Sequence, residues 1–169
     1  MKRILVMGLP DTGKTTLSKA IVTALSKDHT VLWLNADAVR AQFNDWDFST
    51  EGRLRQAQRM RDIADEAERL GRTDYVLADF IAPLQQMRDI YDADVTIWVD
   101  TLPESKYADT NAIFEPPEKY DYRVGHHDEN MWVHLIAYNI LNDKPALKMD
   151  WPTYSRYLDE LKDKCKENT

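Results

Sequence analysis

The chain has 169 residues, of which 43% are hydrophobic and 30% charged, a balance typical of a globular domain with its own core rather than of a disordered chain. The formal net charge of −7 argues against a protein whose main task is to grip a nucleic-acid backbone. The single cysteine, Cys165, cannot form an internal disulfide, and no segment has the pattern of a signal peptide or the apolar length of a membrane span. We therefore expect a cytoplasmic protein that works without a membrane.

Short apolar runs alternate with amphipathic segments over the first hundred residues, which predicts strands alternating with helices. The expected strands cover residues 4–7, 30–37, 74–83 and 94–100. The expected helices cover residues 14–25, 51–70 and 83–91, the second of them stopped by Gly71. This order predicts an α/β fold with a central, mostly parallel sheet and helices on both faces.

The pattern weakens from residue 101 to 128, where a Pro-Pro pair interrupts any helical period. We interpret this stretch as a short lid followed by a short strand at 122–124. A helix is expected over 128–141, and a final polar helix follows it. The predicted organisation is a kinase-like domain over 1–145 and a C-terminal helical tail over 146–169.

A phosphate-binding loop is the clearest motif. Residues 8–15, GLPDTGKT, match G-x-x-x-x-G-K-[ST], with a strand before the loop and a helix after it. Backbone N–H groups of such a loop wrap the phosphates of ATP, Lys14 reaches the β- and γ-phosphates, and the Thr15 hydroxyl ligates Mg²⁺. Asp11 is expected to face solvent, because a carboxylate beside phosphates is unfavourable. The predicted nucleotide-binding residues are Gly8, Leu9, Pro10, Asp11, Thr12, Gly13, Lys14, Thr15 and Thr16.

Acids at strand ends supply the remaining candidates, because ligands of doubly wound sheets bind at that edge. Asp37 is the candidate base that activates an acceptor hydroxyl, or a residue that holds a Mg²⁺ water. Asp79 has the position of a metal-orienting acid. Lys14, Asp37 and Asp79 are thus the predicted catalytic residues, and Thr15, Asp37 and Asp79 the predicted metal ligands.

Arginines near the same edge suit an anionic small-molecule acceptor. Arg40 and Arg88 are favoured because each closely follows the end of an expected strand. The competing interpretation is that each arginine belongs to a solvated helix face.

The chain resembles the adenylylsulfate (APS) kinases, P-loop enzymes that phosphorylate the ribose 3′-hydroxyl of APS. "LNADAVR" is similar to the family's L-D-G-D-N-x-R, "FNDWDFSTEGR" to its L-N-x-D-L-G-F-S-x-x-x-R, and "FIAPLQQMRD" to its F-I-S-P-x-x-x-x-R-D. The resemblance covers about residues 1–105, and the matching positions are Leu34, Asp37, Arg40, Asn44, Phe48, Ser49, Arg53, Phe80, Ile81, Pro83, Arg88 and Asp89.

The resemblance implies roles for several of these residues. Phe48 and Phe80 would sandwich the acceptor's adenine, Arg40 and Arg53 would contact its phosphosulfate, and Asp37 would serve the acceptor hydroxyl and the metal. The resemblance to the APS kinases also implies that the protein forms a homodimer. The full set of expected acceptor-binding residues is Asp37, Arg40, Asn44, Phe48, Arg53, Phe80, Ile81 and Arg88.

The chain also departs from the family pattern. Asn35, Ala38 and Ala82 replace polar or acidic positions, and the lid is short and poor in cations, with Lys106 and Lys119 as those it offers. Alternative acceptors are therefore a nucleoside, a hydroxymethylated nucleobase in DNA, a sugar or a polyol. Nucleic acid is not otherwise expected as a partner. A further alternative is a non-catalytic nucleotide-binding regulatory module.

Overall fold

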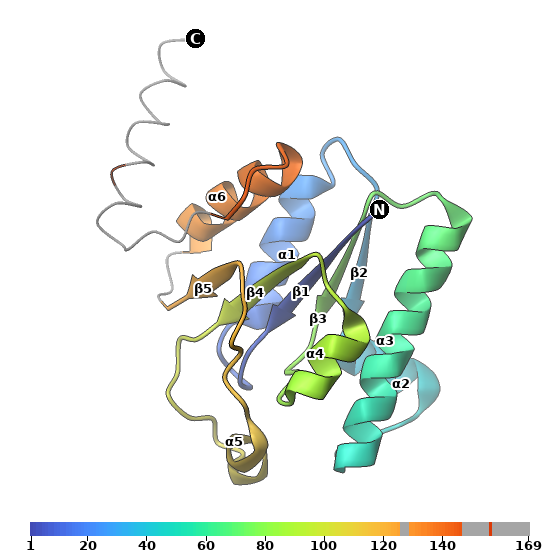
Figure 1. Ribbon diagram of the computed structural model, residues 1–169, viewed down its shortest axis with the longest axis vertical. Helices are drawn as coiled ribbons and strands as arrows, with labels where there is room; N and C mark the ends of the chain where they lie inside the picture. The colour runs from blue at the N-terminus through green and yellow to red at the C-terminus, as the bar shows by residue number, and fades with distance from the viewer. Residues whose placement is uncertain (126–128, 147–155, 157–169) are drawn as a thin grey trace.

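One parallel sheet organises the protein (Figure 1). The computed structural model describes residues 1–125, 129–146 and 156. Five strands lie in the order β2-β3-β1-β4-β5, and every neighbouring pair is parallel. The strands are β1 Lys2–Met7, β2 Val31–Asn35, β3 Tyr75–Asp79, β4 Val95–Val99 and β5 Tyr122–Val124. The helices are α1 Lys14–Leu25, α2 Ala36–Phe43, α3 Thr50–Leu70, α4 Gln85–Tyr91, α5 Ala108–Ile113 and α6 Glu129–Leu141. The predicted α/β fold with a parallel sheet is confirmed.

The central strand β1 is buried on both faces and serves two cores. Ile4 and Val6 belong to one apolar cluster, Leu5 and Met7 to the other, because side chains of a strand alternate between its faces. Helices α1 and α6 cover the first face and α3 and α4 the second (Figure 1). Burial on both faces explains why the strand reads as a continuous apolar run rather than as an alternating one.

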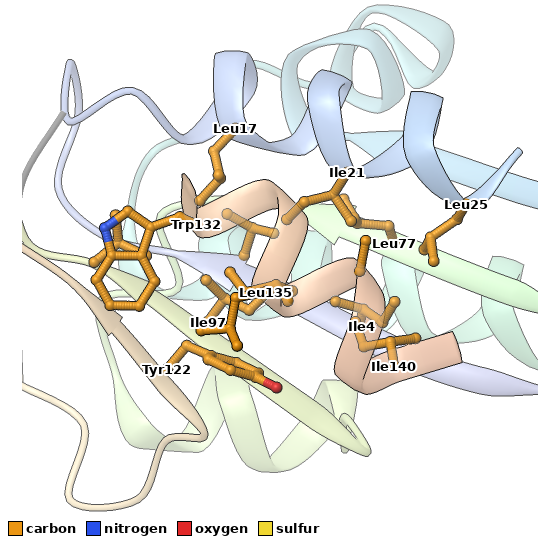
Figure 2. Packing of buried hydrophobic residues seen from close by; sticks show 14 of the residues in the cluster. Ile4, Leu17, Ile21, Leu25, Leu77, Ile97, Tyr122, Trp132, Leu135 and Ile140 are labelled. Carbon is orange, nitrogen blue, oxygen red and sulfur yellow. The ribbon is translucent and has the colours of Figure 1, made fainter. Parts of the chain in front are cut away.

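The first core lies between the sheet and helices α1 and α6. Leu17, Ile21 and Leu25 recur at a spacing of four residues. Their side chains therefore extend from one side of α1 into the cluster beside the sheet (Figure 2). Leu135 of α6 packs into the same cluster and is 1% exposed. Helix α6 therefore helps to stabilise the core on the side of the sheet opposite to α3.

The second core lies between the sheet and helices α3 and α4. Ala57, Met60 and Ala64 are fully buried on one side of this helix, and Tyr91 of α4 is fully buried against the same face of the sheet. Gly71 ends α3 in the left-handed conformation with φ 63°, as the sequence predicts.

The strand and helix boundaries differ from the prediction at the edge of the sheet where the strands end. Strand β2 stops at Asn35, because the Asn35 side chain accepts a hydrogen bond from the Ala38 N–H and starts α2. Asp37 therefore lies in the first turn of a helix and not at the end of a strand, which corrects the prediction for residues 30–37. The expected strand over 74–83 similarly ends at Asp79.

Residues 101–121, here called the lid segment, contain a helix that the sequence did not indicate. Helix α5 has six residues, and Thr110 is its buried member, so no apolar stripe announces it. The predicted strand at 122–124 and helix α6 are confirmed. Apart from residues 146 and 156, the predicted tail over 146–169 lies outside the described residues. Over the described part of the chain, no helix is both long enough and apolar enough to cross a membrane.

We expect the packing of α6 to be worth a large part of the protein's stability. Leu135→Ala should lower the free energy of unfolding by about 2–5 kcal/mol, because it leaves a cavity in the first core. Leu141→Ala, at a 40% exposed position of the same helix, should change it by less than about 0.5 kcal/mol. Urea unfolding of both variants measures the difference, and equal effects would contradict the observed packing.

Candidate active site

A cavity of about 880 Å³ opens where the carboxyl ends of β1, β2 and β3 meet. The loop after β1, the start of α2, the start of α3 and the segment after β3 form its walls, and α5 of the lid segment closes one side. Figure 1 shows α2 and α5 at the same end of the molecule as the loop after β1. Thirteen of the predicted site residues line this cavity: Pro10, Asp11, Gly13, Lys14, Thr15, Thr16, Asp37, Arg40, Phe48, Arg53, Asp79, Phe80 and Ile81.

The loop between β1 and α1 has the backbone that the phosphate-loop motif requires. Gly8 has φ 148°, and a Cβ at this position would lie 2.3 Å from the Val99 carbonyl oxygen, so no other residue fits. The Lys14 ammonium bends back to donate to the Leu9 carbonyl at 2.7 Å. The Thr12 hydroxyl donates to the same carbonyl at 2.8 Å. Gly8, Leu9 and Thr12 thus shape the loop from behind the cavity wall.

Asp11 sits at the turn of this loop with φ 63°. Its side chain is 58% exposed, which confirms the expectation that it faces solvent, and it pairs with Lys106 of the lid segment at 3.4 Å. Asp11 also raises the pKa of Lys106 by this contact. One charged pair therefore joins the phosphate loop to the lid segment.

Asp79 connects three elements at the floor of the cavity. Its carboxylate accepts from the Thr15 hydroxyl at 2.9 Å and from the Asn35 side-chain amide at 3.2 Å. Burial raises the pKa of Asp79, and the bonds from Thr15 and Asn35 and the charge of Lys14 oppose that rise. The end of β3 is thereby fixed to the start of α1 and to the end of β2.

Lys14 faces a cluster of carboxylates. Burial lowers the pKa of Lys14, while the charges of Asp79, Asp11 and Asp37 act in the opposite direction. Asp37 is exposed in the first turn of α2 and lines the cavity. A hydroxyl, an ammonium group and two carboxylates thus surround one space, an arrangement that suits the binding of a metal-complexed phosphate.

The opposite side of the cavity is built on two guanidinium groups and an aromatic ring. Arg40 and Arg53 are 5% and 7% exposed, and their Cζ atoms lie 4.6 and 5.8 Å from the centroid of the Phe48 ring. Arg40 donates to the backbone carbonyls of Asp45 and Asp47 at 3.1 Å each. Arg53 donates through Nε to the Phe48 carbonyl at 2.8 Å. The loop between α2 and α3 therefore holds both arginines in place.

The aromatic residues of the cavity wall differ in how far their side chains are exposed. Phe48 is 50% exposed, and Trp46 beside it is also exposed and lines the cavity. Phe80 is 7% exposed and packs edge to face against Tyr91 at 5.9 Å between ring centroids. Phe80 thus belongs both to the second core and to the cavity wall.

Two predicted acceptor-binding residues do not reach the cavity wall. Asn44 is exposed and ends α2 in the left-handed conformation with φ 49°. Arg88 is buried behind the wall, where it donates to the backbone carbonyls of Pro83 and Glu115. The structure gives both residues a part in holding the chain around the cavity.

Several residues of the cavity wall were not predicted as site residues. They are Asn35, Ala36, Trp46, Gln56, Ala82, Pro83, Met87, Tyr107, Asp109 and Thr110. Asn35, Trp46 and Ala82 stand in or next to segments that carry the family resemblance, so a signal existed for them. Tyr107, Asp109 and Thr110 lie in the lid segment, where no periodicity indicated which side chains turn inward.

Comparison with known proteins agrees with this geometry. The sequence model of the family described as adenylylsulphate kinase matches residues 2–106. The APS kinase of Mycobacterium tuberculosis in complex with AMPPNP and APS superimposes with a TM-score of 0.70 at 16% identity, over 82% of this chain and 96% of that one. A hexameric APS kinase from Thiobacillus denitrificans gives 0.66 at 22% identity, over 88% of this chain and 30% of that one.

A kinase of another family shares the fold as well. Shikimate kinase from Acinetobacter baumannii, in complex with shikimate, gives a TM-score of 0.55 at 16% identity, over 85% of this chain and 95% of that one. The sequences of curated proteins give no match to the chain.

The family match spans more than half of the chain and includes the phosphate loop and the arginine pair. Together with the parallel sheet and the loop geometry, it defines an ATP-dependent P-loop kinase that transfers a phosphoryl group to a hydroxyl. The chain belongs to the adenylylsulfate kinase family.

Proposed function

We propose that the protein phosphorylates APS at its ribose 3′-hydroxyl with ATP as the phosphoryl donor. The observation that carries this proposal is the pair of buried guanidinium groups across the cavity from Lys14. Over residues 1–125 and 129–146, Nε and Nη2 of Arg40 and Nη1 of Arg53 have no hydrogen-bond partner in the protein. These N–H groups suit the phosphosulfate of APS, because guanidinium groups bind such anions through paired N–H donors.

The electrostatics of the arginine pair favour an anionic acceptor. Burial lowers the pKa of Arg40, and the positive charges of Arg53 and Arg59 lower it further, although Asp45 opposes them. A bound anion would relieve this repulsion. Phe48, stacked beside both guanidinium groups, and Phe80, across the cavity wall, would hold the adenine ring.

The chemistry would proceed by positioning and by neutralising charge. The loop amides of residues 8–16 and the Lys14 ammonium would hold the triphosphate. The 3′-oxygen would attack the γ-phosphorus, its bond to phosphorus would form as the bond to the β,γ-bridging oxygen breaks, and ADP would leave. Asp37 would orient the hydroxyl and take its proton.

A magnesium ion fits the donors at the floor of the cavity. Thr15, Asp37 and Asp79 offer a hydroxyl and two carboxylates, the hard oxygen ligands that Mg²⁺ prefers. Bound there, the ion would neutralise charge on the phosphates.

A second candidate is a kinase of the same family with another hydroxyl acceptor. Asn35 favours it, because an amide at this position donates to Asp79 where the family pattern has a carboxylate. An ADP-release assay with Mg-ATP should respond strongly to APS and weakly to nucleosides, sugars, polyols and hydroxymethylated bases in DNA. Turnover with one of these acceptors and none with APS would reject the first candidate in favour of the second, whereas no turnover with any acceptor would reject both.

Stacking of the acceptor on Phe48 can be tested with a matched control. Phe48→Ala should raise the KM for APS roughly 5- to 150-fold, because a base–aromatic stack contributes about 1–3 kcal/mol. Phe43→Ala removes a ring of equal exposure from the same part of the chain but not from the cavity wall, and it should leave the KM unchanged. Equal KM values for the two variants would contradict the stacking.

The pH dependence of nucleotide binding should report on Lys14. Burial lowers the pKa of Lys14 below the usual 10.5, so its charge is present at low pH and is lost as the pH rises through this lowered value. Titration of Mg-AMPPNP by calorimetry should show affinity falling before ordinary lysines lose their protons. Lys106→Gln should keep this decline, because Asp11 raises the pKa of Lys106. Constant affinity up to about pH 10.5 would contradict the assignment.

A further inference from the structure

The lid segment meets the body of the protein at a few points. Two of its hydrogen bonds go to backbone carbonyls of the body: the Thr101 hydroxyl donates to the Thr12 carbonyl, and the Glu115 N–H donates to the Pro83 carbonyl. Between these anchors, Lys106 pairs with Asp11 of the phosphate loop at 3.4 Å. A second ion pair is made by α5 and lies on the acceptor side of the cavity.

Arg53 receives this second contact. Its Nη2 atom donates to the Thr110 hydroxyl at 3.1 Å and lies 3.5 Å from a carboxylate oxygen of Asp109. The two partners differ sharply: Thr110 is 3% exposed, whereas the Asp109 side chain is 72% exposed. Thr110 is therefore a fixed part of the wall, and Asp109 is a solvated carboxylate that rests against a buried cation.

We propose that Asp109 is a specificity-determining residue whose carboxylate competes with the anionic group of an acceptor for the positive charge of Arg53. The inference rests on the proposed anionic acceptor. An acceptor anion that binds Arg53 must either displace Asp109 or sit beside it against like-charge repulsion. Both routes weaken the binding of anionic acceptors and leave that of neutral ligands unaffected.

Displacing the Asp109 carboxylate from Arg53 costs little free energy. The pair is largely solvent-exposed on the Asp109 side, and such pairs contribute little to stability. The hydrogen bond from Arg53 to the Thr110 hydroxyl does not use the Asp109 carboxylate, so this carboxylate can turn away while the bond stays in place. The side chain can thus yield to a ligand without unfolding α5.

The test compares ligands that differ only in an anionic group. Calorimetry in saturating Mg-AMPPNP, which fills the nucleotide side, measures the Kd of AMP and of adenosine for the wild type, Asp109→Asn and Glu118→Gln. Glu118 is an exposed lid carboxylate without an ion pair to any described residue, so its variant removes the same charge from the same segment. Asp109→Asn should tighten AMP about two- to five-fold and leave adenosine unchanged, and Glu118→Gln should change neither.

Three outcomes would overturn the proposal: equal tightening of AMP and adenosine, equal tightening of AMP in both variants, or no tightening of AMP in Asp109→Asn. Absence of AMP binding to wild type and variant alike falls under the last of these. Turnover of APS is measured separately on the same samples. A selective effect on AMP without APS turnover would reject APS as the acceptor and retain Asp109, whereas APS turnover with unchanged AMP affinities would reject Asp109 alone.

Discussion

The carboxylate of Asp79 is the junction on which the rest of the site depends. It accepts hydrogen bonds from Thr15 and from Asn35, so one buried group ties the ends of β2 and β3 to the first turn of α1. A buried carboxylate is stable only when hydrogen bonds and neighbouring charge compensate its lost hydration. Lys14 supplies that charge from the same turn. Removing Thr15 or Asn35 would leave this buried carboxylate with one hydrogen bond fewer.

The buried charges on the two sides of the cavity are compensated by different groups. On the nucleotide side, the carboxylates of Asp79, Asp11 and Asp37 lie around the Lys14 ammonium, and a metal-complexed triphosphate would change this balance of charge. On the acceptor side, Arg40 and Arg53 stack on Phe48 and are held through backbone carbonyls, which leaves some of their N–H groups open to the cavity. The lid segment makes one ion pair with each side. It supplies the cation on the nucleotide side, where Lys106 pairs with Asp11, and the anion on the acceptor side, where Asp109 pairs with Arg53.

Most of the fold could be predicted because its signals are local. Continuous apolar runs indicate strands buried on both faces, and the phosphate-loop motif is contiguous in sequence. Helices α2 and α5 escaped prediction for a physical reason: each is short and has few buried residues, so no apolar stripe marks it. The end of β2 depends on a side-chain cap from Asn35, which periodicity does not register.

Site residues were predictable where the chain brings them to a strand end or where the family resemblance marks them. That resemblance also marked Asn44 and Arg88, which the structure places behind the wall as a helix end and as an anchor of the lid segment. Asp109 could not be found in this way, because its partner Arg53 precedes it by more than fifty residues and the pairing is set by tertiary structure. A match to a family motif therefore marks a residue as a candidate for the site, and the structure shows whether that residue lines the cavity or supports its wall.

The most direct test of the proposed arrangement is a crystal structure of the protein with Mg-AMPPNP and APS bound. We expect the triphosphate on residues 8–16 beside Lys14, the phosphosulfate against Arg40 and Arg53, and the ribose 3′-hydroxyl facing Asp37. An APS molecule bound elsewhere, or bound with its phosphosulfate away from both arginines, would contradict the assignment of the acceptor site.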